Sequence, residues 1–164
     1  MAMATTTPIR GEGRRADDSS ARWVCFELAG QLYGLEILKV QEVLASADIE
    51  SVPGAPSQIL GISNLRGSIV TILDLRRRLG LPGSEISLTN CVVVVDGHGE
   101  PVGLRVDRVI DVRSIASHAV KAPPATGSGA SGVLGVVTRA SEVLTLLDAT
   151  VMVAPLMAHS AMAA

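Results

Sequence analysis

The segment Gly61–Asp74 reads GISNLRGSIVTILD, and it places an apolar run on each side of the sequence Asn-Leu-Arg-Gly. A second segment, Gly135–Asp148, reads GVVTRASEVLTLLD and stands 74 positions further along the chain. The apolar residues after the turn, a mid-strand threonine and the closing aspartate coincide in the two segments. Strand-like runs that flank a short turn predict a β-hairpin, so the chain contains the same hairpin twice.

The two hairpins differ at the turn. The first copy has Arg66-Gly67 where the second has Ala140-Ser141. Because the second copy forms its turn without arginine, folding does not require the arginine of the first. A guanidinium is always charged and can bind a carboxylate through two parallel hydrogen bonds. Arg66 is therefore the strongest candidate for a functional residue in the chain.

The repeat extends upstream of the hairpins. Gly34–Val43 aligns with Gly103–Val112 at an offset of 69 positions, so the second copy gains five residues before its hairpin. The Pro-, Gly- and Ser-rich stretch 121–132 lies in that interval and is predicted to be a flexible loop. Two halves of about five strands are too small for independent cores. Closing each half into a barrel and packing the two together would hide the sheet edges around one shared core.

We therefore predict a mainly β fold with a few short helices. Asp74 and Asp148 are placed to cap short helices, one over Leu75–Leu79 and one near the C-terminus. Residues 1–21 lack a hydrophobic period and are predicted to be a disordered tail, with residues 22–153 as the folded domain and 154–164 as a frayed end. Arg76–Arg78 is predicted to be a solvated face of the first short helix.

Composition argues against several classes of function. The net charge of −2 and the pI of about 5.9 provide no basic surface for nucleic acid, and aromatic residues make up only 2% of the chain. No apolar run reaches the roughly 18 residues of a membrane span. Cys25 and Cys91 lack metal-ligand spacing and are predicted to be core thiols of a reduced, cytoplasmic protein. No cofactor or metal site is predicted.

The equivalent placement of Asp74 and Asp148 invites comparison with aspartic proteases, in which each half contributes one carboxylate. Those sites need a glycine-containing turn after each aspartate. Here Leu75-Arg76 and Ala149-Thr150 follow, and these residues begin helices. Helix capping is the better explanation, so we do not expect an enzyme.

Five segments, taken together, resemble the CheW family of bacterial chemotaxis coupling proteins over about Trp23 to Val153. They are Tyr33–Val43 (YGLEILKVQEV), Val52-Pro53, Gly61–Val70 (GISNLRGSIV), Leu73–Arg76 (LDLR) and Gly103–Val109 (GLRVDRV). The resemblance implies two SH3-like five-stranded β-barrels packed around a shared core. It also implies a non-catalytic adaptor in chemotaxis signal transduction.

The partners implied by the resemblance are the regulatory SH3-like domain of the histidine kinase CheA and the cytoplasmic tip of a methyl-accepting chemoreceptor. The chain would be cytoplasmic and recruited to membrane-associated receptor arrays without inserting into the membrane. By position, Arg66 and Glu42 match family residues involved in coupling, and Val40 and Val112 match apolar contact positions. The full set of implied partner-binding residues is Arg66, Glu42, Val40, Asn64, Gly67, Val112 and Cys91.

Two alternatives remain open at the level of sequence. The chain could be a CheW-like adaptor of another chemosensory pathway, such as gliding or pilus movement. From a different class, it could be a small nucleic-acid-binding β-barrel, which salt-dependent binding would reveal.

Overall fold

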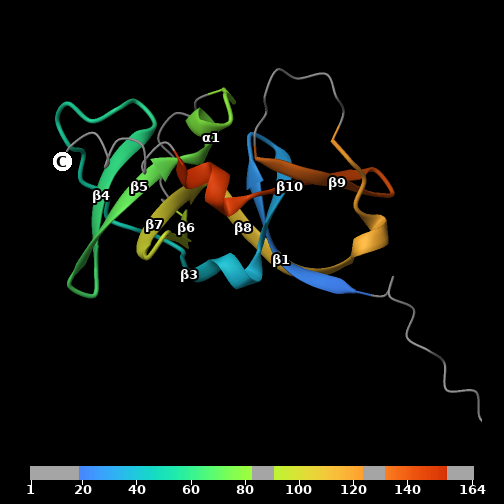
Figure 1. Cartoon of the computed structure of the whole chain (residues 1–164). Coiled ribbons are helices and arrows are strands. Elements are labelled where there is room, and N and C mark those ends of the chain that lie inside the picture. Colours follow the sequence, from blue (N-terminus) through green and yellow to red (C-terminus); the bar gives the residue numbers. More distant parts are fainter. Residues whose placement is uncertain (1–18, 83–90, 124–131, 155–164) are drawn as a thin grey trace, which may run out of the picture.

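The computed structural model describes residues 19–82, 91–123 and 132–154, which form ten strands and four short helices (Figure 1). The strands are β1 (Ser20–Leu28), β2 (Gln31–Glu36), β3 (Val40–Leu44), β4 (Ile59–Leu65), β5 (Ser68–Asp74), β6 (Cys91–Gly97), β7 (Glu100–Val106), β8 (Arg108–Ala116), β9 (Val133–Arg139) and β10 (Glu142–Leu147). The helices are η1 (Ile37–Lys39), α1 (Leu75–Arg78), η2 (Ser117–Ala119) and residues 149–154. The predicted hairpins and the mainly β fold class are confirmed.

The strands form two five-stranded sheets. Sheet A has the order β8-β1-β2-β10-β9, and sheet B has the order β3-β6-β7-β5-β4. Both sheets mix strands from the two halves of the chain, and Figure 1 shows sheet B on the left and sheet A on the right. The repeat relates β1 to β6, β2 to β7, and so on to β5 and β10. Exchanging each strand for its counterpart converts the order of sheet A into the order of sheet B. The repeat is therefore present in the topology as well as in the sequence.

The two predicted five-stranded units are present, but each combines strands of both halves, so the prediction that each half closes by itself is wrong. In sheet A, β2 pairs in parallel with β10, and in sheet B, β5 pairs in parallel with β7. Strands joined by a tight turn pair antiparallel, whereas a parallel neighbour must come from a distant part of the chain. Each half therefore completes the sheet of the other, and neither half can form its sheet alone.

Two isolated bridges cover the edge strands at equivalent places. Glu50 pairs with Ile62 on β4, and Lys121 pairs with Val136 on β9. The segment that contains Glu50 approaches β4 so closely that a Cβ on Gly61 would overlap the Glu50 carbonyl group. Gly135 is the counterpart of Gly61, and a Cβ there would stand 2.9 Å from the Lys121 carbonyl oxygen. Both glycines thus permit the same closure of a sheet edge.

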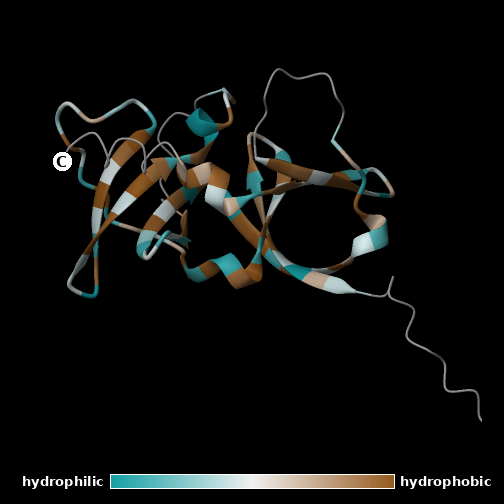
Figure 2. Cartoon of the chain, in the orientation of Figure 1, coloured by the Kyte–Doolittle hydropathy of each residue, from teal (hydrophilic) through white to brown (hydrophobic). Residues whose placement is uncertain are grey.

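The largest hydrophobic cluster lies between the sheets and draws on both. It includes Phe26 and Leu35 of sheet A, Leu73 and Leu104 of sheet B, and Met152 of the last helix, all fully buried. Two smaller clusters each belong mainly to one sheet. Figure 2 shows hydrophobic residues concentrated along the strands of both sheets. The predicted shared core is confirmed.

The two aspartates have the predicted capping role. Asp74 Oδ1 accepts a hydrogen bond from the Arg76 amide at 3.1 Å, and Asp148 Oδ1 accepts one from the Thr150 amide at 2.9 Å. These bonds satisfy amides that the first helical turn leaves unpaired.

Several predicted boundaries lie outside the described residues or are shifted. The tail 1–18, most of the loop 121–132 and residues 155–164 are not described. Ser20 and Ala21, predicted to lie in the disordered tail, belong to β1, because Ser20 pairs with Ala116 of β8. Lys121, predicted to lie in a flexible loop, is held by its bridge to Val136. The last helix includes residue 154, predicted to be frayed.

Both cysteines are free thiols buried in the fold, as predicted for core residues. Cys25 is fully buried and Cys91 is 7% exposed. Burial raises the pKa of Cys25 to about 11 and also raises the pKa of Cys91. Within the described ranges no group of acidic, histidine and cysteine residues could hold a metal ion, and no helix is long and apolar enough to cross a membrane.

We expect both thiols to resist alkylation in the native protein. At pH 8 a pKa of about 11 leaves roughly a hundredfold less thiolate than an ordinary cysteine has, and burial also blocks access. Iodoacetamide labelling followed by mass spectrometry checks this, with urea-unfolded protein as the control. Rapid labelling of Cys25 in the native state would contradict the packing described here.

Candidate protein-interaction site

The exposed side chain of Arg66 lies where the two edges of sheet B approach each other. Arg66 is in the turn after edge strand β4, and Glu42 is on the opposite edge strand β3. Arg66 Nη2 donates to Glu42 Oε1 at 2.8 Å, with side-chain exposures of 79% and 25%. Two residues that the family resemblance implies are therefore in direct contact. Because the Arg66 side chain is 79% exposed, most of its guanidinium remains available to a partner. The ion pair itself contributes only about 0.2–1 kcal/mol to stability.

The turn that carries Arg66 is built by its neighbours. Arg66 and Gly67 have φ values of 52° and 85°, as in a type I′ hairpin turn. Asn64 Oδ1 accepts a hydrogen bond from the Gly67 amide at 3.0 Å, which fixes the turn. Ala140 has the same φ of 52°, so this backbone conformation does not require arginine.

Sheet A has a comparable ion pair with reversed polarity. Arg113 on edge strand β8, the counterpart of β3, donates to Glu142 Oε2 at 3.2 Å, and Glu142 follows the second hairpin turn. Arg113 also binds Asp111, the counterpart of Glu42, at 3.0 Å. Of the two repeated hairpins, only the first has a guanidinium within its two-residue turn, but a charged bridge is common to both sheets.

Two apolar side chains near the pair escaped the sequence analysis. Ile69 on β5 is 62% exposed and Val43 on β3 is 41% exposed. Ile69 and Asn64 also line a cleft of about 520 Å³ that continues over Leu44 and Ala47. The signal was present in Ile69-Val70, because adjacent residues of a strand face opposite sides and only Val70 can enter the core. An exposed aliphatic residue such as Ile69, in the same hairpin as a charged residue, is suited to protein contact.

The remaining predicted site residues fall in different surroundings. Val40 on β3 is half-buried and packs against the shared core. Val112 is 44% exposed and lies on β8 of sheet A, so it is on a different sheet from the Arg66–Glu42 pair. Cys91 is buried in the shared core, and we therefore leave it out of the proposed contact surface.

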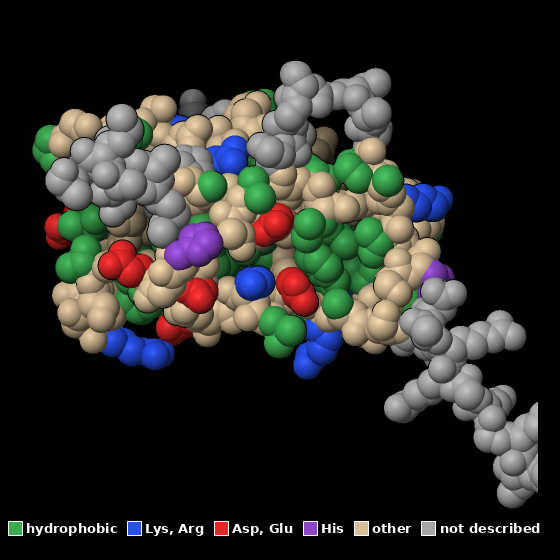
Figure 3. Space-filling model, viewed as in Figure 1, with side chains coloured by type: hydrophobic (Ala, Val, Ile, Leu, Met, Phe, Trp, Pro, Cys, Tyr) green, Lys and Arg blue, Asp and Glu red, His purple; other side chains and the backbone are tan. Residues whose placement is uncertain are grey.

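The three arginines of α1 do not form a free basic face, which corrects the sequence prediction. Arg76 binds Asp107, Arg77 Nη1 donates to the Ser57 carbonyl at 2.6 Å, and Arg78 Nη2 donates to the Val151 carbonyl at 3.0 Å. Each guanidinium ties α1 to another segment. In Figure 3, acidic and basic side chains are scattered over the visible face, and hydrophobic side chains gather in a hollow over sheet A.

Comparison with known proteins agrees with these features. The family model described as the CheW-like domain matches residues 22–155. The chemotaxis protein CheW of Klebsiella aerogenes is 32% identical over 147 residues, which cover 90% of this chain and 80% of that protein. Protein FrzA of Myxococcus xanthus is 31% identical over 128 residues, which cover 76% and 79% of the respective chains.

Among solved structures, the chain is similar to the scaffolding protein TtCheW from Thermoanaerobacter tengcongensis. The TM-score is 0.74 with 30% sequence identity, over 82% of this chain and 92% of that one.

Proposed function

The chain belongs to the CheW-like family of non-catalytic chemotaxis scaffolds, and from this we propose that it couples methyl-accepting chemoreceptors to the histidine kinase CheA. It would act as a cytoplasmic adaptor recruited to membrane-associated receptor arrays. Holding the kinase and the receptor tip at a set separation would let the receptor state alter kinase activity. A difference in binding of 1–3 kcal/mol between states is sufficient for such coupling.

The observation that carries the proposal is the exposed Arg66–Glu42 pair, with the exposed Ile69 in the same hairpin as Arg66. The pair adds little to stability, and the equivalent turn is formed with alanine, so folding does not account for the arginine. A charged group that can be desolvated against a partner, next to exposed aliphatic residues, is typical of an interaction site. Val40 and Val112 remain predicted contact positions.

We expect Arg66→Ala to weaken coupling without changing the fold. Removing a central interface arginine costs at least about 1.4 kcal/mol, which corresponds to tenfold in affinity. Kinase activity is measured in a reconstituted mixture of receptor fragment, CheA and this chain, with thermal unfolding measured in parallel. Arg22→Ala, at an exposed arginine of β1, is the matched control. Wild-type coupling by the Arg66→Ala variant would reject the assignment of this surface.

The similarity to protein FrzA keeps a second candidate, an adaptor of another chemosensory pathway. Affinity for the receptor and kinase of one pathway over those of another in the same organism separates the two. The nucleic-acid alternative has no support in the charge of the chain, since the net charge is −2.

A further inference from the structure

The chain passes between the two sheets at two places only within the described residues. It leaves sheet A through η1, between β2 and β3, and returns at Asp107, between β7 and β8. These two crossings are related by the repeat, because Asp107 is the counterpart of Leu38 in η1. Their surroundings differ sharply.

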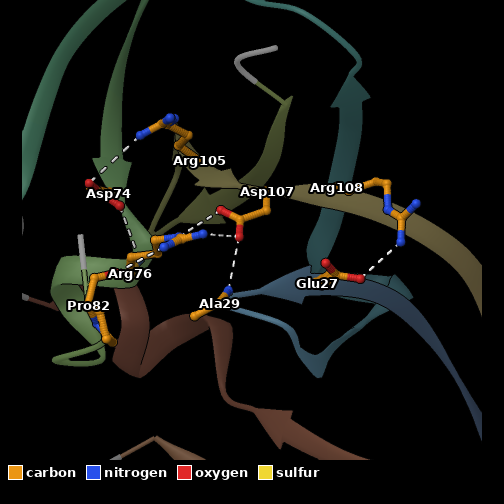
Figure 4. A network of polar contacts seen from close by, with 8 residues as sticks. All are labelled: Glu27, Ala29, Asp74, Arg76, Pro82, Arg105, Asp107 and Arg108. Atoms are coloured by element: carbon orange, nitrogen blue, oxygen red, sulfur yellow. Dashed lines mark hydrogen bonds and ion pairs between the residues drawn. The ribbon is translucent and has the colours of Figure 1, made fainter. Parts of the chain in front are cut away.

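The carboxylate of Asp107 joins three segments (Figure 4). Arg76 of α1 binds it through two nitrogens, with Nε donating to Oδ1 at 2.8 Å and Nη2 donating to Oδ2. The Ala29 amide, in the turn between β1 and β2, donates to Oδ2 at 2.9 Å. Arg76 Nη1 also donates to the Pro82 carbonyl at 3.0 Å. One carboxylate therefore connects α1, which lies between β5 and β6 of sheet B, to the first hairpin of sheet A.

The counterpart crossing has no such link. Leu38 is 84% exposed, and η1 contains no buried residue. The counterparts of Ala29 and Arg76 are His98 and Thr150. Leu38, the counterpart of Asp107, has no carboxylate that could bind them. The two crossings are thus alike in topology, but only one is held by an ion pair among the described residues.

The shared core and the ion pair constrain the sheets in different ways. Apolar burial holds the sheets together, but it is non-directional and selects weakly among relative orientations. A bidentate guanidinium–carboxylate pair is directional. Fixing the relative position of packed segments is the best-supported role of partly buried ion pairs. Burial alone would raise the pKa of Asp107, but the hydrogen bonds from Arg76 and the Ala29 amide outweigh it and lower this pKa. The pair therefore stays ionised near neutral pH.

We propose that the Arg76–Asp107 pair is an ionic pin that sets the orientation of sheet A relative to sheet B. The pin acts through one crossing, and the crossing at η1 stays unpinned. The inference goes beyond the proposed function, because it concerns the isolated chain and holds whether or not the partners are CheA and a chemoreceptor.

The test measures the distance between the sheets directly. Spin labels are attached to Glu100→Cys at the β6–β7 turn and to Ser141→Cys at the β9–β10 turn, in a Cys25→Ala, Cys91→Ala background. Double electron–electron resonance then gives the distribution of distances between sheet B and sheet A in the free protein. With the pin intact we expect a single narrow peak.

Three variants separate orientation from simple stability. Asp107→Asn removes the charge, and the double variant Arg76→Met with Asp107→Leu replaces the pair by apolar side chains, which often preserves stability. Glu27→Gln breaks the exposed Arg108–Glu27 pair nearby and is the matched control. We expect the narrow peak to be lost in the first two, with circular dichroism unchanged, and kept in the control.

Either of two results would overturn the proposal. A narrow, unshifted peak in folded Asp107→Asn and in the folded double variant would show that the core alone sets the orientation. Failure of both variants to fold would show that the pair is needed for folding and is not an orienting device. Because the measurement involves no partner, neither result bears on the coupling assay described above.

Discussion

Gly61→Ala is expected to lower the free energy of unfolding by about 3 kcal/mol, through overpacking and two lost hydrogen bonds. A methyl group at this position would overlap the Glu50 carbonyl group, which is backbone and cannot rotate away. Glu50 and Ile62 exchange two hydrogen bonds of 2.8 Å there, so the bridge that covers β4 would open. An edge strand without this cover also loses protection against pairing with other chains.

Urea unfolding followed by circular dichroism measures this effect. Gly34→Ala is the matched control, because its nearest neighbour would be a methyl group of Leu146 at 3.2 Å that can move. We expect the control to lose under about 1 kcal/mol. Equal losses in Gly61→Ala and Gly34→Ala would mean that the close approach of Glu50 is not what requires glycine.

The second large effect is expected for charge reversal at the interaction site. Arg66→Glu should weaken partner binding by about 2–5 kcal/mol, at least roughly thirtyfold, because it places a like charge where a guanidinium docks. Stability should change by no more than about 1 kcal/mol, the upper value for an exposed pair. Calorimetric titration with the CheA regulatory domain or with the receptor fragment gives the loss.

The swapped variant, Arg66→Glu with Glu42→Arg, distinguishes two roles of this pair. The ion pair across sheet B can reform, but the guanidinium now lies on β3 instead of the hairpin tip. We expect binding to stay weak, since docking depends on the tip. Recovery of wild-type affinity would show that only the bridge between β3 and the turn matters, and that Arg66 does not itself contact a partner.

Local patterns predicted the hairpins well. The turn after β4 contains a glycine at positive φ, and the runs that flank this turn and its repeat have strand composition. The start of β1 was placed too late because Ser20–Arg22 is polar and short of strand signals. Its pairing with β8 is a contact between residues far apart in the sequence, and a short stretch of sequence does not reveal such a contact.

The candidate site was predicted in part. Arg66 stood out because the repeat supplies an internal comparison, and Glu42 entered through the family resemblance. Ile69 and Val43 were not singled out, because hydrophobicity alone does not show which face of a strand is buried. The bonds of the α1 arginines could not be foreseen, because their acceptors on Ser57, Asp107 and Val151 are distant in sequence.

The sequence by itself determined the duplicated set of hairpins, the helix caps and a shared apolar core, since each depends on residues close together along the chain. Only the tertiary structure decided that the halves exchange strands and that one of two equivalent crossings carries an ion pair. The physical reason is that an apolar pattern depends only on residues close together along the chain, and the burial of apolar surface is non-directional. The choice of strand partners depends on covering every edge of two sheets at once, which is a property of the whole chain.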